Sequence, residues 1–209
     1  MSNIRAAAVA GQFYPGNAAE LAQTVDKFLR AESTNLPCPK AIVAPHAGYV
    51  YSGSTAAKAY ARVRNGADVI SRVILLGPAH RVGFRGMALS GADFYSTPLG
   101  QVPIDKAAVE RIRKLASVGN LDQAHAEEHS LEVHLPFLQR CLGKFSLVPI
   151  VVGQCQAEDV ARVLDTLWGG AETLIVVSSD LSHQMPYPDA QSKDAKTSLK
   201  ILNRDTDIK

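Results

Sequence analysis

The stretch RVILLGPAH, residues 72–80, decides the fold of this chain. Val73 to Leu76 form an apolar run without polar alternation, which is typical of a strand buried on both faces in a parallel sheet. Further runs of this kind occur three times, and a weaker one once. They are KAIVA (40–44), LVPIVV (147–152) and TLIVVS (173–178), with MALSG (87–91) as the weaker run.

Segments with helical spacing separate these runs. In residues 18–31, Leu21, Val25, Phe28 and Leu29 share one face, and Asn17 precedes them as an N-cap. The other helical segments are 54–63, 105–116, 157–168 and a polar one from Asp189 onward. Strands that alternate with helices predict an α/β fold, a three-layer sandwich with a mainly parallel central sheet flanked by helices. We expect the strands that end near residues 44, 76 and 178 to lie in one sheet.

Composition limits the function classes. A chain of 209 residues is expected to form a single domain over 1–209. The 22 basic and 20 acidic residues leave a net charge of +2, which favours neither a nucleic-acid nor a membrane partner. No apolar run reaches the roughly 18 residues of a membrane span. Three widely spaced cysteines, Cys38, Cys141 and Cys155, favour a reduced, cytoplasmic location.

Three histidines follow buried strands. His46, His80 and His183 each lie shortly after the end of an apolar run. Ligands of open α/β sheets bind outside the carboxyl ends of the strands, so we expect these side chains to meet at one rim. Neutral imidazole is a common metal ligand, although any one of them taken alone also fits an ordinary loop histidine. Asp180 either orients His183, binds substrate or caps a helix.

The stretch HAEEHSLEVH, residues 125–134, holds three more histidines. His125, Glu128 and His129 fit the H-x-x-E-H pattern of inverted zinc peptidases. That motif needs an uninterrupted helix and a downstream acidic ligand, whereas Pro136 interrupts the helix and no second acidic motif follows. We therefore expect His125, in a loop, and His129 not to share a metal. His134 is expected to pack in the interior.

Several longer motifs occur in a fixed order and resemble the Memo family, whose bacterial and archaeal members are called AmmeMemoRadiSam system protein B. They are RAAAVAGQFYPG, PKAIVAPHAGYVYSG, ILLGPAHRVG, YSTPLG, EHSLEVHLPFL and SSDLSH, and they run from about residue 5 to about residue 190. The family is similar in fold and site position to class III extradiol ring-cleaving dioxygenases. Those enzymes hold Fe(II) with two histidines and a carboxylate.

The resemblance implies a role for each matching residue. It makes His46 and His80 metal ligands, and His183 the general acid/base, with Asp180 in the same pocket. It places Phe13 and Tyr51 in the pocket wall that contacts substrate. It makes EHSLEVHLPFL a helix whose first turn borders the site, so that Glu128 and His129 either contact substrate or form a salt-bridged helix start.

The resemblance also implies a third ligand, a cysteine in a segment beyond residue 209. Cys155 follows a strand but does not match that position. We therefore expect a Memo-like domain that lacks the family's C-terminal segment and leaves its pocket exposed. Metal binding is expected to be weak, because two histidines alone make a poor site.

Two functions remain open at this stage. The first is a metal-dependent, dioxygenase-like oxidoreductase that uses iron, or copper when a cysteine is a ligand. It would act on a small molecule or peptide, with a radical-SAM enzyme as system partner. The second is a non-catalytic module that binds a peptide or a partner protein in the same pocket. Metal content and oxygen uptake separate the two.

Overall fold

The computed structural model describes residues 2–32 and 34–205. These residues form two compact parts, one that ends at Ser179 and one that begins at Asp180, and each is described by itself. The expectation of a single domain over 1–209 stays a prediction.

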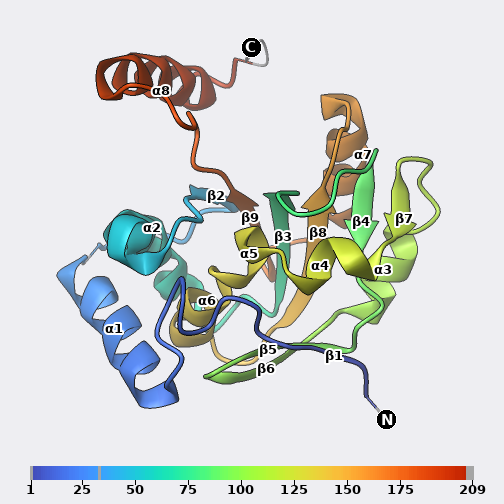
Figure 1. Ribbon diagram of the computed structural model, residues 1–209, viewed down its shortest axis with the longest axis horizontal. Helices are drawn as coiled ribbons and strands as arrows, with labels where there is room; N and C mark the ends of the chain where they lie inside the picture. The colour runs from blue at the N-terminus through green and yellow to red at the C-terminus, as the bar shows by residue number, and fades with distance from the viewer. Residues whose placement is uncertain (1, 33, 206–209) are drawn as a thin grey trace. The chain divides into compact units, whose positions relative to one another are not determined.

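The first part is built on a six-stranded sheet (Figure 1). Its strands, in spatial order, are β2 (Ala41–Ala44), β9 (Thr173–Ser178), β3 (Arg72–Pro78), β8 (Ser146–Val152), β4 (Met87–Leu89) and β7 (Val118–Asn120). All neighbours run parallel except β4, which is antiparallel to β8. The strands predicted to end near residues 44, 76 and 178 are adjacent in this sheet, so that prediction is confirmed.

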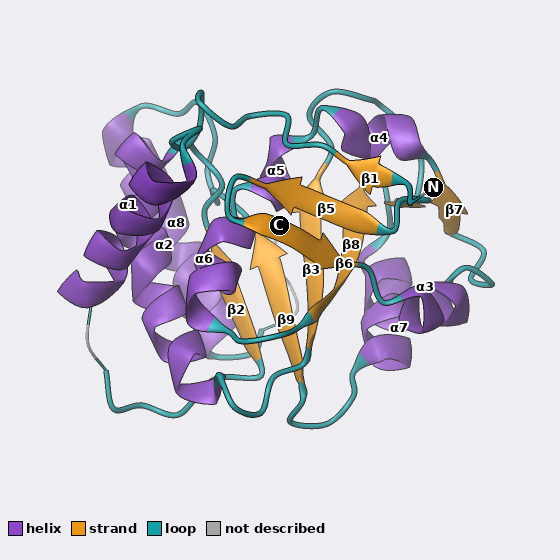
Figure 2. Ribbon diagram, turned by 90° about the horizontal axis from the view of Figure 1, so that it is seen from below, coloured by secondary structure: helices purple, strands orange, loops and turns teal. Residues whose placement is uncertain are grey.

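Helices cover both faces of the sheet. Figure 2 shows α1, α2 and α6 on one side and α3 and α7 on the other, which confirms the α/β three-layer sandwich. The helices of this part are α1 (Ala18–Ala31), α2 (Tyr49–Val63), α3 (Lys106–Ile112), α4 (Asp122–Ala126), α5 (His129–Glu132), α6 (Leu135–Cys141) and α7 (Ala157–Leu167), with a 3₁₀ turn η1 at Arg64–Gly66.

Burial explains why the apolar runs form the centre. The residues of β3 from Val73 to Leu76 are at most 4% exposed, because helices cover both faces of the sheet. In α1, Leu21, Val25 and Leu29 are buried as predicted, and the Asn17 side chain accepts hydrogen bonds from the backbone of the first helical turn.

A second, small sheet was not anticipated. It consists of β1 (Ile4–Arg5), β5 (Phe94–Thr97) and β6 (Gly100–Pro103), in that order. β1 runs parallel to β5, and β5 pairs with β6 in the antiparallel sense. Strands of two to four residues are too short to give a clear alternation of apolar and polar side chains.

The region from residue 122 to 141 differs from expectation in two ways. His125 lies in α4 and not in a loop, and EHSLEVHLPFL is not one helix but the two short helices α5 and α6. Pro136 occupies the first turn of α6, where its missing N–H costs nothing. The same residue inside a continuous helix would remove a backbone hydrogen bond, so the chain restarts its helix there.

The second part contains α8 (Tyr187–Leu202), two residues longer at its start than predicted. In the turn before it, the backbone N–H and the hydroxyl of Ser182 both donate to Asp194. Over 2–32 and 34–205, no helix combines the length and apolar character that crossing a bilayer would require.

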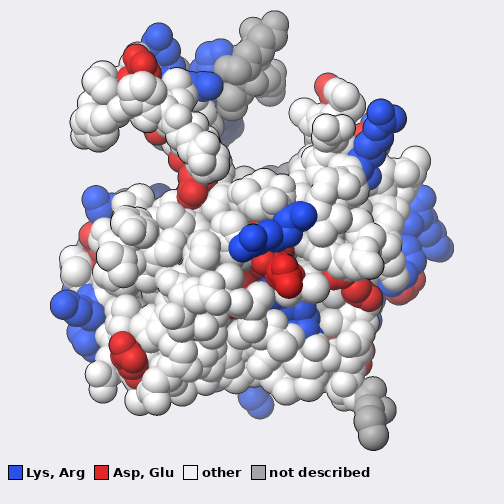
Figure 3. Space-filling model, in the orientation of Figure 1, with Lys and Arg blue, Asp and Glu red and all other residues white. Residues whose placement is uncertain are grey.

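The surface agrees with the balanced charge. On the face of the first part drawn in Figure 3, basic and acidic side chains are interspersed among uncharged ones. Such a surface creates no strong field of one sign on this face.

Candidate metal centre

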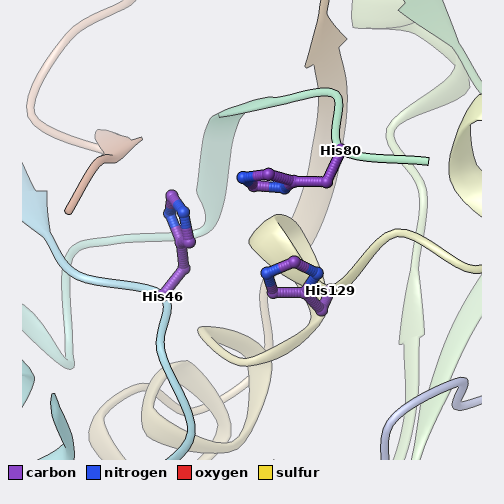
Figure 4. Close-up of side chains that lie close together, drawn as sticks. All are labelled: His46, His80 and His129. Carbon is purple, nitrogen blue, oxygen red and sulfur yellow. The ribbon is translucent and has the colours of Figure 1, made fainter. Parts of the chain in front are cut away.

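Three histidines from distant parts of the chain meet at the rim of the central sheet (Figure 4). His46 and His80 each lie two residues beyond the end of a parallel strand, β2 and β3, and their ring centroids are 5.1 Å apart. α5 packs against β3 and brings His129 to the same place. The His129 ring centroid lies 4.5 Å from that of His80 and 5.7 Å from that of His46. We call these three residues the histidine triad.

The donor set of the triad suits a metal ion. One ring nitrogen of each residue lies within 4.8 Å of the other two. Nitrogens that share a tetrahedral ion about 2 Å away lie about 3–4 Å apart, so small side-chain rotations would bring the donors together. Imidazole nitrogens suit iron, copper, zinc and nickel.

Glu128 is hydrogen-bonded to both the ring and the backbone of His80. Its carboxylate accepts a hydrogen bond from His80 Nδ1 at 2.9 Å and another from the His80 backbone N–H at 2.6 Å. The backbone N–H of Ser130 donates to the same carboxylate at 3.0 Å. Burial raises the pKa of the Glu128 carboxyl, but the hydrogen bonds from His80 and Ser130 outweigh burial and hold the pKa below its usual value. Glu128 is therefore an ionised acceptor.

Ser178 holds His46 in a similar way. The Ser178 hydroxyl lies 2.6 Å from His46 Nδ1 and donates to the backbone carbonyl of Ser130 at 2.7 Å. His46 is only 5% exposed, so its ring has room for small rotations but not for large ones.

A buried carboxylate, Glu132, fixes the N-terminal segment beside the triad. It accepts hydrogen bonds from the backbone N–H groups of Ala8 at 2.8 Å and Val9 at 3.0 Å, and it pairs with Arg5. Tyr14 donates its hydroxyl to Glu132 at 2.5 Å. Burial, together with the Glu132 charge, raises the pKa of this tyrosine well above its usual value.

The fixed segment carries Phe13, whose ring centroid lies 4.6 Å from that of His129. This residue was predicted to line the pocket. The contact with His129 places it against the triad.

The comparisons with known proteins agree with the motifs. The family model described as "Memo-like protein" matches residues 5–207. The chain belongs to the Memo family. A Memo relative from Aquifex aeolicus, named MEMO1 family protein, is 40% identical over 91% of this chain and 72% of its own length. A Memo protein from Methanopyrus kandleri is 35% identical over 96% of this chain and 76% of its own length.

Vertebrate relatives are similar over a smaller share of their length. Protein MEMO1 of Xenopus laevis is 33% identical over 86% of this chain, which covers 62% of the frog protein. The Memo resemblance read from the motifs is thus confirmed at the level of the family.

Two other histidines of this Memo chain are engaged in its interior. His125 Nδ1 lies 2.6 Å from the Tyr95 hydroxyl, and its Nε2 lies 3.0 Å from the Ala88 carbonyl. His134 is 1% exposed, as expected for a packing residue, and its Nδ1 lies 2.9 Å from the Tyr60 hydroxyl. Burial lowers the pKa of His125 to about 4, and burial with the nearby His46 lowers the pKa of His134 to about 3. Both imidazoles are therefore neutral.

A cavity of about 610 Å³ is lined by sequence neighbours of the triad. Gln12 precedes Phe13, Arg81 follows His80, and Glu127 precedes Glu128. None of the three histidines of the triad lines this cavity, whereas the interior residue His125 does.

The other predicted site residues are not members of the triad. Tyr51 lies on α2 and is 84% exposed, and it is not among the rings described as packing on the triad. His183 and Asp180 belong to the second part, so their roles stay predictions. Cys155 is half-buried in the loop after β8, near Asp159, and is not in the triad.

Sequence reasoning expected His129 either to contact substrate or to form a salt-bridged helix start, and did not anticipate its approach to His46 and His80. The only signal was H-x-x-E-H, which pairs His129 with the wrong partner, His125. Ser130 and Ser178 carried no signal, because serines at strand and helix ends are common.

Proposed function

We propose that this chain is a metal-binding, dioxygenase-like redox protein of the Memo family whose ion is held by His46, His80 and His129. The proposal rests on one observation, the approach of three imidazole nitrogens to within 4.8 Å at the carboxyl ends of parallel strands. His129 serves here as a third donor within the chain itself. The ion is iron, with copper as the second candidate, because imidazole ligands suit both.

The chain's own residues divide the work around the ion. A bound iron would supply Lewis acidity and one-electron chemistry toward oxygen. Phe13 packs on the ring of His129 and supports it on one side. In this proposal Tyr51 contributes to the substrate wall, while His183 moves protons as general acid/base with Asp180 as its partner. Glu128 orients His80 in this proposal and is not part of the substrate wall, because its carboxylate is already bonded to His80.

The ligand is a small molecule or a peptide, and the cavity lined by Gln12, Arg81 and Glu127 is the proposed place for it. Its mixed lining of Arg81, Asp122 and Glu127 suits a polar ligand better than a purely apolar one. A radical-SAM enzyme is the proposed system partner.

The first test is metal binding. Metal-free protein is titrated with Fe²⁺ under anaerobic conditions and, in parallel, with Cu²⁺, and bound metal is measured after desalting. We expect one ion per chain, lost in His46→Ala and in His80→Ala. The proposal is overturned when the wild type retains no stoichiometric metal, or when both variants retain it.

The second test separates an enzyme from a binding module. Oxygen uptake by the iron-loaded protein is measured with a panel of catechols and small peptides. We expect uptake that disappears in His183→Ala while that variant keeps its metal. Stoichiometric metal without uptake for any compound would favour the binding module.

A further inference from the structure

We infer that the tripeptide Glu128-His129-Ser130 at the start of α5 organises the whole triad, by fixing a hydrogen on Nδ1 of both His46 and His80. Their Nε2 atoms then become the metal donors. Glu128 and Ser178 are accordingly positioning residues. The metal part of this inference rests on the proposed function, whereas the part that concerns hydrogen positions does not.

The His80 arm follows from the acceptor character of Glu128. The side chain of Glu128 is 1% exposed, and its carboxylate accepts hydrogen bonds from two backbone N–H groups, those of His80 and Ser130. A carboxylate in this setting can only accept hydrogen bonds. His80 Nδ1, at 2.9 Å, must therefore carry the hydrogen. In a neutral imidazole this leaves the lone pair on Nε2.

The His46 arm reaches the same result through two serines. A serine hydroxyl has one hydrogen, and Ser178 donates it to the Ser130 carbonyl at 2.7 Å. The Ser178 oxygen can therefore only accept from His46 Nδ1, 2.6 Å away. His46 thus carries its hydrogen on Nδ1, and Nε2 is again the donor atom for a metal.

Both arms end on the same three consecutive residues, 128–130. Glu128 is the N-cap of α5 and receives the Ser130 N–H, while the Ser130 carbonyl receives the Ser178 hydroxyl. The residue between them, His129, is itself a member of the triad. Three consecutive residues therefore supply one donor and orient the other two. Outer partners of this kind fix the tautomer of a metal-binding histidine and its direction.

His125 provides an internal reference with the opposite hydrogen position. Its Nε2 faces the Ala88 carbonyl, which can only accept, so the hydrogen lies on Nε2. Its Nδ1 then accepts from the Tyr95 hydroxyl. One protein thus holds both tautomers.

The first experiment uses the metal-free protein and needs no activity. Two-bond ¹H–¹⁵N correlation spectra at pH 8 report which ring nitrogen of each histidine carries hydrogen, with assignments from single His→Gln variants. We expect the Nδ1–H form for His46 and His80, and the Nε2–H form for His125. An Nε2–H form at either of the first two overturns the inference.

The second experiment links the tautomers to metal affinity. Glu128→Gln and Ser178→Ala are titrated with Cu²⁺ and Fe²⁺, and we expect about 10–100-fold weaker binding. Glu158→Gln removes the same charge from an exposed position in the first turn of α7, and Ser146→Ala removes a hydroxyl that also donates to a backbone carbonyl, at the start of β8. Both controls should bind like the wild type, and Ser178→Thr should restore affinity because it keeps the hydroxyl.

The outcomes separate the two proposals. A wild type that binds no metal ends the proposed function, and the spectra of the metal-free protein then decide the inference alone. Wild-type binding that is unchanged in both Glu128→Gln and Ser178→Ala overturns the inference and leaves the proposed function standing. Thermal melting of every variant shows whether binding is lost because the variant unfolds. For a variant whose melting temperature is lowered, the ring-nitrogen spectrum recorded below that temperature replaces the affinity as the test.

Discussion

The rim of the sheet and the interior beside it use the same side chain in opposite ways. At the rim, His46, His80 and His129 bring nitrogens toward one another. In the interior, His125 has both nitrogens occupied by protein groups, and His134 is fully covered. Two of these five residues, His125 and His129, are only four positions apart in the sequence.

The difference teaches that surroundings, and not residue type, separate a candidate ligand from a packing residue. Imidazoles that converge on one another have a shared space in which an ion can replace water. Imidazoles that donate and accept within the core complete its hydrogen bonding, which is what buried polar groups require. Four measurements test whether the two regions differ in this way.

The largest expected effect is on stability. His125→Ala leaves a cavity and removes the partners of the Tyr95 hydroxyl and the Ala88 carbonyl, so the free energy of unfolding should fall by about 3 kcal/mol. His80→Ala at the rim should cost less than about 1 kcal/mol, because Glu128 keeps its bonds to two backbone N–H groups. Denaturant unfolding of both variants measures this. Equal losses would erase the distinction between the two regions.

The next effect is on metal affinity and has the reverse order. His129→Ala removes a donor of the triad, and its affinity for Cu²⁺ should fall at least about 100-fold, or about 2.7 kcal/mol. His125→Gln, the other histidine of H-x-x-E-H, should keep the affinity of the wild type. Isothermal titration at pH 7 compares them. If Cu²⁺ affinity falls as much in His125→Gln as in His129→Ala, the two histidines bind the same metal, as the H-x-x-E-H pattern would require.

The third effect is the contribution of the two interior histidines to the pH dependence of stability. The pKa of His125 is about 4 and that of His134 about 3 in the folded protein, against about 6.5 when unfolded. The unfolded chain therefore binds more protons below pH 6.5, so stability is full above that pH and falls as pH drops toward 4 and 3. Each residue should remove about 2 kcal/mol between pH 7 and pH 5.

Unfolding curves at several pH values in the wild type and in His125→Gln measure this dependence. The variant should lose about half of the slope contributed by the two histidines. An identical slope in both proteins would show that His125 is not buried in its neutral form.

The smallest effect concerns the wall of the triad. Phe13→Ala removes a ring that packs on His129, and Cu²⁺ affinity should fall less than about tenfold, because no donor is lost. Phe28→Ala is the matched control. Phe28 packs on Tyr49 and Phe137, so its loss should lower stability and leave affinity unchanged. A loss of more than 100-fold in Phe13→Ala would contradict a purely supporting role.

The main elements of the fold were within reach of the sequence, and the small sheet was not. Unbroken apolar runs such as RVILL predict buried strands because only a covered sheet hides both faces of a strand. In β1 and β5, short strands give no such signal, since their pairing depends on what lies next to them in space. Pro136 indicated that no continuous helix extends through residues 128–138. It did not indicate whether the segment forms two short helices or one helix that begins near the proline.

The candidate site was predicted in part. His46 and His80 follow strand ends, and a parallel sheet brings such ends to one edge, which is why their proximity could be expected. His129 could not be placed there, because its position depends on how α5 packs against β3.

Local features of this protein can be predicted from its sequence: where the main strands and helices lie, which of their faces are apolar, and to which family the motifs belong. Apolar periodicity and proline act within a few residues, so they can be read from the chain. Which histidines lie together, and that Ser178 and Glu128 hydrogen-bond to them, becomes clear only from the folded chain. Those relations join residues 48 to 132 positions apart, and no local rule connects Ser178 to His46 before the chain has folded.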